Sequence, residues 1–315
     1  MSNLPLMDGI TLIDSGMIRE GLAACYALER DGRIAIIETG TRNSVPRILA
    51  WLADNSYGRD QVDYVIATHV HLDHAGGVGL LMQEIEGATL VIHPRGARHM
   101  AQPAKLQAGA TAVYGEEAYQ QMYGDLIPVS EDRMHIAEDG STLTLGASTL
   151  TFLDTPGHAN HHFCVHESVS NGFFTGDTFG IAYRELLVAG RPFIFPSSTP
   201  VQFNPEALKA SIQRMLEFGT ERMFLTHYGM VEEPAALALE LYEQIDGYVA
   251  ICDEVLAQMP EAGFERGALI QERLTEFTLA RALAHGCEEA TAREHIAFDM
   301  GLNAQGLEVW LAGRS

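Results

Sequence analysis

The sequence predicts an α/β fold followed by a helical C-terminal extension. Through about residue 230, short runs rich in β-branched and aromatic residues alternate with segments of helical periodicity. After about residue 232 the strand signals stop, and helix-forming residues dominate to the end of the chain. We therefore predict a mixed domain over residues 1–245, which carries the chemistry, and a helical extension over residues 246–315.

The predicted strands are short and are bounded by turn residues. The clearest pair, 22–29 and 33–38, is joined by Asp31-Gly32, a dipeptide typical of a two-residue hairpin. The apolar run 62–68 has the length and composition of a buried strand. Further strands are predicted at 89–93, 148–154, 162–166, 172–175 and 222–226.

Four helices are predicted within the first part of the chain. The segment 205–218 begins with Asn204 as a side-chain cap and Pro205 in the first turn, and its apolar residues fall on one face. A second predicted helix covers 44–54, and a third follows the loop at Gly76-Gly77. The fourth covers 97–121, a segment that is also compatible with a mobile cover.

The acidic charge balance argues against nucleic acids and anionic membranes as partners. The chain has 20 Lys and Arg against 42 Asp and Glu, a formal net charge of −22. Such a surface repels phosphate backbones and anionic lipids, and no basic stripe offsets it. We expect a small-molecule substrate, with neither nucleic acid nor membrane as a partner.

The cysteines and the apolar runs indicate a cytoplasmic protein. The four cysteines lie far apart and form no CxxC pair, which favours reduced, buried thiols. No uncharged apolar stretch approaches the ~18 residues of a membrane span. The first 30 residues show no basic segment ahead of a hydrophobic run, so we expect no secretory signal.

The segment 68–74 (THVHLDH) is the strongest chemical signal. It places His69, His71 and His74 with Asp73 at the end of a predicted strand. Strand periodicity would point His69 and His71 to the same side. A single histidine is usually an ordinary polar residue, but imidazole and carboxylate at this density are typical ligands of Zn²⁺ and similar ions.

Three later strands end in the same way, with a ligand-type residue on a tight turn. They run into 155–158 (TPGH), 176–178 (GDT) and 227–229 (HYG). Each turn is weak evidence alone, because such tripeptides are common. Strand ends of a rigid scaffold can aim several ligands at one point, so together with the histidine cluster they predict a metal site.

The order HxHxDH, then His, Asp and His, resembles the metallo-β-lactamase-fold hydrolase superfamily over about residues 10–230. The resemblance implies an αββα sandwich of two mixed sheets with helices outside and metals at one edge. It implies two divalent metal ions, with Zn²⁺ preferred and Fe or Mn also compatible with the ligands. The implied ligands are His69, His71 and His158 for the first ion, Asp73, His74 and His227 for the second, and Asp177 as the bridge.

Two positions depart from the family pattern. The family often has TPGHTxGH, but here Ala159 replaces Thr, His161 replaces Gly, and His162 matches the final His. At an earlier strand end the family usually has Asp before Thr-Gly, and here Glu38 stands there. We expect Glu38 to orient a ligand histidine or its loop. We expect His161 and His162 to lie near the site without binding metal.

The implied reaction is hydrolysis. Two ions can share a water, lower its pKa towards ~7 and so produce a bridging hydroxide, while Asp73, the expected catalytic residue, aims it. This chemistry suits a small thioester, ester or lactone, as in the glyoxalase II and lactonase branches. One alternative is an oxidoreductase like the mononuclear iron persulfide dioxygenases, which keep the HxHxDH string. Another is a binding module without catalysis, although such chains usually lose ligands.

The segment after Asp177 is expected to line the substrate pocket. Its aromatic residues include Tyr183 and Phe195, and Tyr228 directly follows a predicted ligand. We predict these three as substrate-binding residues, with a tyrosine hydroxyl donating to an oxyanion. The helical extension is expected to form a lid or a homodimer surface, and the sequence leaves both open.

Overall fold

The computed structural model describes residues 3–7, 9–198, 200–259 and 261–314. Contacts along the chain divide it into two units. The first unit comprises Met1–Asp154, His161–Gly176 and Thr226–Met230, and the second comprises Thr155–Asn160, Asp177–Leu225 and Val231–Ser315. The predicted division into 1–245 and 246–315 stays a prediction.

The first sheet has seven strands in chain order. Its strands are β1 (Asn3–Met7), β2 (Ile10–Asp14), β3 (Ala24–Arg30), β4 (Arg33–Ile37), β5 (Val62–Ile66), β6 (Thr89–Ile92) and β7 (Met134–Ile136). Strands β1 to β4 pair antiparallel, and β4 to β7 pair parallel. The sheet is therefore mixed, and the parallel half directs the carboxyl ends of β4, β5 and β6 to one edge.

Helices cover the parallel half of this sheet. They are α1 (Val45–Asp54), α2 (Leu72–Ala75), α3 (Val78–Glu84), α4 (Pro94–Ala101), α5 (Ala104–Tyr114) and α6 (Glu116–Met122). In α1, Val45, Ile48 and Leu52 are buried at spacings of three and four residues, which puts them on one face. That face packs into a core with Ile36 of β4 and Val65 of β5.

The second sheet has six strands, in the order β13-β12-β11-β10-β9-β8. Their bounds are β8 (Thr142–Leu145), β9 (Ser148–Asp154), β10 (Phe163–Glu167), β11 (Gly172–Phe174), β12 (Arg222–Leu225) and β13 (Gly229–Glu232). Strands β8 to β11, which belong to the first unit, form antiparallel pairs with their sequence neighbours.

The two sheets face each other within the first unit. Tyr26 of β3 meets Phe174 of β11 edge to face, with ring centroids 5.3 Å apart. At the ends of β3 and β10, the buried carboxylate of Glu167 accepts hydrogen bonds from the guanidinium of Arg30, at 3.1 and 3.0 Å. Ser148 and the Ser170 backbone N–H also donate to Glu167. The sandwich interior therefore contains a fully hydrogen-bonded ion pair.

We expect Glu167→Gln to lower the free energy of unfolding at pH 7 by about 3 kcal/mol, because Arg30 would lose its buried partner. Burial alone would raise the pKa of Glu167, but Arg30, Ser148 and Ser170 lower it to about 2. The stabilisation is thus complete above pH ~4.5 and is lost as the pH falls towards 2. Urea melts at pH 7 and pH 3 test this.

Glu221→Gln is the matched control, because the Glu221 side chain is 63% exposed. Its effect should stay within about 0.5 kcal/mol. Equal stability of Glu167→Gln and the wild type at pH 7 would contradict this role of the ion pair.

One predicted helix is divided in the structure. The segment 97–121 is not a single helix but falls within α4, α5 and α6, which are separated at Pro103 and Gly115. Gly115 has a positive φ of 81° that a continuing helix does not allow. The composition of this segment favours helix throughout, but the helix is interrupted at Pro103 and at Gly115.

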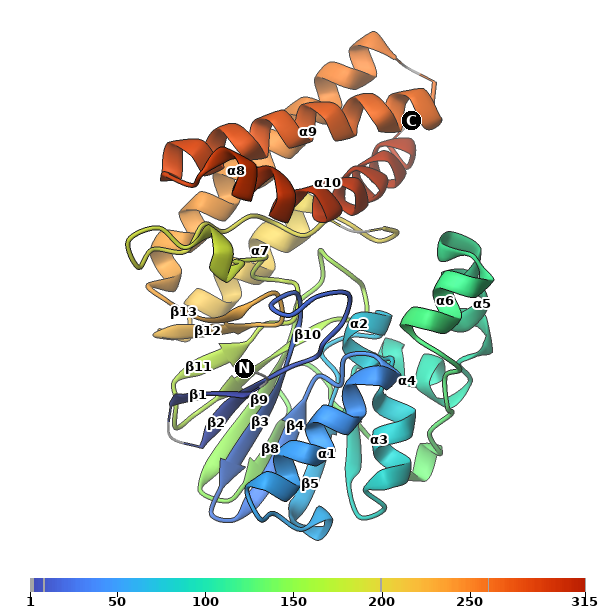
Figure 1. The fold of residues 1–315 in the computed structure, drawn as a ribbon, viewed down its shortest axis with the longest axis vertical. Helices are drawn as coiled ribbons and strands as arrows, with labels where there is room; N and C mark the ends of the chain where they lie inside the picture. The colour runs from blue at the N-terminus through green and yellow to red at the C-terminus, as the bar shows by residue number, and fades with distance from the viewer. Residues whose placement is uncertain (1–2, 8, 199, 260, 315) are drawn as a thin grey trace. The chain divides into compact units, whose positions relative to one another are not determined.

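The second unit is built around four helices, α7 (Pro205–Leu216), α8 (Pro234–Gln258), α9 (Phe264–His285) and α10 (Glu289–Ala312). Helices α8, α9 and α10 lie together (Figure 1). Arg266 of α9 makes a two-point ion pair with Glu308 of α10, at 2.8 and 3.0 Å. Among the described residues, no helix has the length and apolar character that crossing a membrane requires.

Candidate metal centre

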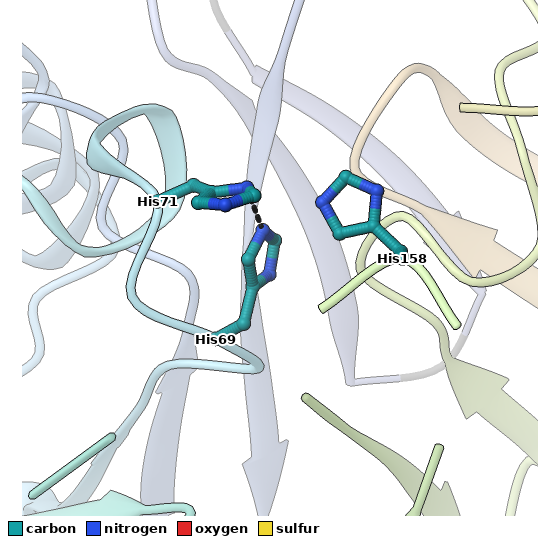
Figure 2. Close-up of side chains that lie close together, drawn as sticks. All are labelled: His69, His71 and His158. Atoms are coloured by element: carbon teal, nitrogen blue, oxygen red, sulfur yellow. Dashed lines mark hydrogen bonds between the residues drawn. The ribbon is translucent and has the colours of Figure 1, made fainter. Parts of the chain in front are cut away.

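The loop after β5 carries the first group of candidate ligands. Strand β5 ends at Ile66, so His69 and His71 lie beyond the strand and not on it. Their ring nitrogens nevertheless meet, with His69 Nε2 and His71 Nδ1 2.9 Å apart (Figure 2). The loop therefore achieves the juxtaposition that strand periodicity was expected to produce.

A second group of donors converges on Asp73. His74 Nε2 lies 3.5 Å from Asp73 Oδ2, and His227 Nε2 lies 3.3 Å from the same oxygen. Asp73 and His74 belong to the short helix α2, whereas His227 follows β12 far along the chain. One ligand atom of each residue lies within 4.8 Å of the others. One carboxylate oxygen and two imidazole nitrogens at this spacing are typical ligands of a divalent cation.

The rings are held with Nε2 in the metal-binding form. His74 Nδ1 donates to Glu38 Oε1 at 3.1 Å, and His227 Nδ1 donates to the Leu22 carbonyl at 2.7 Å. Since each Nδ1 carries the proton, Nε2 carries the lone pair. A hydrogen bond to a carboxylate or carbonyl at the remote nitrogen is typical of metal-binding histidines. The residues present therefore fit a metal site.

Glu38 organises this side of the site, as the sequence predicted. It is buried, and its Oε1 also accepts a hydrogen bond from the Thr68 hydroxyl. The Thr68 oxygen in turn lies 3.1 Å from His69 Nδ1, so one carboxylate orients both His74 and His69. Ligand atoms of Glu38, His69 and His74 also lie within 4.8 Å of one another. Glu38 has a φ of 63°, a strained backbone conformation that is common at functional sites.

Asp73 is held in its ionised form. Its side chain is about a quarter exposed. Burial alone would raise the pKa of this carboxyl group, but the neighbouring imidazoles of His74 and His227, when protonated, bring the pKa well below its usual value. Asp73 thus presents a carboxylate, the form that binds cations, at neutral pH.

The second unit contains a group of its own around His158 and Asp177. His158 Nε2 lies 3.5 Å from Asp177 Oδ2. The Ser197 hydroxyl donates to Asp177 Oδ2 at 3.2 Å and lies 3.3 Å from His158 Nδ1. His158, the third side chain labelled in Figure 2, is completely buried. Gly157 places it, because a Cβ there would come within 2.3 Å of the Leu208 backbone nitrogen.

All seven predicted ligands thus fall into small groups within their own units: His69 with His71, Asp73 with His74 and His227, and His158 with Asp177. Sequence reasoning missed the residues that support them. Ser197 carries no motif, and the Leu22 carbonyl belongs to the backbone, so neither has a recognisable signature. Thr68 adjoins the histidine cluster, and this adjacency was a usable signal.

His161 and His162 both lie beside the ligand loop in the first unit. The His162 ring is buried and stacks on His69 with centroids 4.7 Å apart. The ring centroid of His161 lies 6.2 Å from that of His69 and 5.6 Å from that of His71. Their expected position near the site is confirmed.

The three predicted substrate residues are buried. The Tyr183 hydroxyl donates to Asp299 at 3.0 Å, and the ring of Phe195 packs beside it. The Tyr228 hydroxyl donates to Asp14 at 3.1 Å. Their role in binding substrate stays a prediction.

We expect Glu38→Gln to weaken metal binding by about 10- to 100-fold, because an amide is a poorer acceptor for His74 Nδ1–H and lacks the charge that holds the ring. Competition with a chromogenic chelator measures this. Glu206→Gln, at a side chain that is 79% exposed, is the control. Unchanged affinity in a folded Glu38→Gln protein would show that Glu38 does not orient the ligands.

Comparisons with known proteins agree with this geometry. The family model described as the metallo-beta-lactamase superfamily matches residues 18–227. A metallo-beta-lactamase fold-containing protein of Sulfurisphaera tokodaii, ST1585, is 27% identical over 214 residues, which cover 67% of this chain and 74% of that protein. A Gallus gallus protein named acyl-coenzyme A thioesterase MBLAC2 is 25% identical over 275 residues, covering 80% of this chain and 88% of that one.

Solved structures share the fold. The crystal structure of ST1585 matches with a TM-score of 0.61 at 22% identity, covering 92% of this chain and 100% of that chain. The Thermus thermophilus protein TTHA1429 matches with a TM-score of 0.62 at 20% identity, covering 93% of this chain and 94% of that chain. The predicted fold class is therefore confirmed: two sheets flanked by helices, with C-terminal helices α8–α10.

Proposed function

This chain belongs to the metallo-beta-lactamase superfamily, and from that premise we propose that it is a dinuclear metal-dependent hydrolase of small thioesters, esters or lactones. The observation that supports this most strongly is the convergence of His74 Nε2 and His227 Nε2 on Asp73 Oδ2, with both rings oriented through Nδ1. Buried ligand atoms that converge in this way cost the protein stability unless a cation binds them.

In the proposal, the seven predicted ligands would hold two ions. His69, His71 and His158 would hold the first ion, Asp73, His74 and His227 would hold the second, and Asp177 would be a ligand of both. All donor atoms are nitrogen or oxygen, which suits Zn²⁺ and also accommodates Fe or Mn.

The metal pair, when bound, supplies a water of lowered pKa and a Lewis acid for the substrate carbonyl. The chain's own residues orient the reactants. Asp73 accepts a hydrogen bond from the attacking water and directs it at the carbonyl carbon. Glu38 keeps His74 and His69 in the tautomer that leaves Nε2 deprotonated. Ser197 holds Asp177 through its hydroxyl hydrogen bond.

Within this reaction class, a thioester is the favoured substrate. The Gallus gallus and Homo sapiens relatives are both named acyl-coenzyme A thioesterase MBLAC2, and the former aligns over 80% of this chain. A thiolate is also a better leaving group than an alkoxide. An activated water therefore hydrolyses a thioester more readily than an ester. Location in the cytoplasm, and homodimer formation through the C-terminal helices, remain part of the proposal.

A substrate panel with metal analysis tests the proposed function. We expect purified protein to hydrolyse acyl thioesters faster than lactones, and not to cleave phosphodiesters. His285→Ala, a change at a partly exposed histidine of α9, is the control and should keep full activity. One iron per chain, with oxygen uptake in the presence of glutathione persulfide, would overturn the proposal in favour of an oxidoreductase. A protein that hydrolyses none of these substrates would refute it.

A further inference from the structure

A local basic segment stands out in this acidic chain. Between Glu86 and Glu116 there is no acidic residue, although the whole chain carries 42 of them. The same stretch contains Arg95, Arg98 and Lys105, all of them exposed. The first two belong to α4 and the third to the first turn of α5.

Helix α4 packs directly on the loop of predicted ligands. Gly96 is buried in the middle of the helix's contact face, and a Cβ there would lie 3.0 Å from Val70 Cγ1. Val70 stands between His69 and His71 in the chain. A side chain at Gly96 would crowd Val70, so the glycine lets the backbone of α4 pack closely on the loop that carries His69 and His71.

Two histidine rings connect α4 with the ligands. The ring centroid of His161 lies 5.6 Å from that of His71 and 6.0 Å from that of His99 on α4. Residues four apart share a face of a helix, so Arg95 lies on the same side of α4 as His99. The basic side of α4 therefore adjoins the rim of the ligand loop within the first unit.

The position of these basic residues beside the ligand loop is important because the rest of the chain is strongly acidic and repels anions. With a net charge of −22, the molecule repels a phosphate-bearing substrate at long range. A guanidinium can form two parallel hydrogen bonds with a phosphate, and exposed arginines beside a reaction centre offset the repulsion locally.

We propose that the basic surface formed by Arg95 and Arg98 of α4 and Lys105 at the start of α5 binds phosphate groups on the leaving thiol of the substrate. This rests on the proposed thioester hydrolysis. It assigns the substrate class as thioesters of a phosphate-bearing thiol, and it makes these three residues specificity determinants. The acyl group lies at the metal centre, and the phosphates lie over α4.

Two substrates with the same acyl group separate this binding from the chemistry. Acetyl-coenzyme A carries phosphates, and S-acetyl-N-acetylcysteamine carries none. We expect wild-type kcat/KM to be at least about tenfold higher for acetyl-coenzyme A. Arg98→Glu should lower the ratio of the two kcat/KM values by about tenfold or more, mainly through KM. Arg293→Glu on α10 makes the same charge change at a side chain that is 57% exposed, and it should leave the ratio unchanged.

Equal kcat/KM for the two substrates in the wild type, or an unchanged ratio in Arg98→Glu, would overturn the inference while leaving thioester hydrolysis intact. If neither thioester is hydrolysed, the proposed function fails, and calorimetry with coenzyme A decides the inference alone. Salt-sensitive binding that Arg98→Glu weakens about tenfold supports it, and the absence of binding overturns it. Inhibition by inorganic phosphate as strong as that by coenzyme A would indicate a general phosphate site and also overturn it.

Discussion

Replacing His158 or Asp177 with alanine is expected to abolish hydrolysis and to leave a folded protein. In the proposal, His158 binds the first ion and Asp177 bridges the two, so either change removes a ligand on which water activation depends. A loss of several kcal/mol of transition-state stabilisation corresponds to about 1,000-fold or more in kcat/KM. Steady-state kinetics with an acyl thioester measures the loss, and circular dichroism checks folding.

Matched controls come from the same unit of the structure. His285→Ala removes a partly exposed histidine from α9, and Asp253→Ala removes an exposed aspartate from α8. Both variants should keep wild-type kcat/KM. Because His158 and Asp177 also contact each other and Ser197, the double variant should lose no more than either single variant. Retained activity in either single variant would refute the proposed ligand set.

Removal of metal is the second change with a large expected effect. Dialysis against a chelator should reduce hydrolysis to background, because the nucleophile depends on the bound cations. It should also lower the melting temperature, since a ligand at 1,000 times its Kd stabilises the folded state by about 4 kcal/mol. The Asp73 carboxylate and the Nε2 lone pairs of His74 and His227 are then left without the cation that they would bind.

The same chelator saturated with zinc is the control, and it should change neither activity nor melting temperature. Addition of Zn²⁺, Mn²⁺ or Fe²⁺ to the stripped protein should restore hydrolysis, and the most effective ion identifies the metal. Full activity in protein shown to contain no metal would exclude metal-dependent hydrolysis.

The sequence correctly predicted turns and helix caps, whose conformation depends on a few neighbouring residues. The hairpin around Asp31-Gly32 forms as expected, with both residues at positive φ. The Asn204 side chain caps α7 by accepting from the Ala207 backbone N–H at 3.0 Å. In both cases a few neighbouring residues determine the backbone, so no information from distant parts of the chain is needed.

Elements that depend on distant partners were missed. The first two strands, β1 and β2, were not predicted, although β2 pairs with β3 over five residues. Their short, mixed composition gives little periodicity, and pairing within the sheet stabilises them. The breaks at Pro103 and Gly115 carried the right residues, but a helix-rich composition outweighed them in the prediction.

The candidate site likewise combines residues that the sequence predicted with contacts that it did not. The ligand types and their order were readable from the sequence, because metal binding requires particular side chains. The contacts that orient them were not all readable, because the Leu22 carbonyl and the Ser197 hydroxyl act through position and not through residue type. Glu38 was found only because it occupies the place of a family aspartate.

The most direct test is a crystal structure of the purified protein with anomalous diffraction recorded at the absorption edge of its metal. We expect two anomalous peaks, roughly 3.5–4 Å apart, both touching Asp177. Three histidines, His69, His71 and His158, should surround the first peak, and Asp73, His74 and His227 the second. A single peak, or none among these seven side chains, would contradict the account.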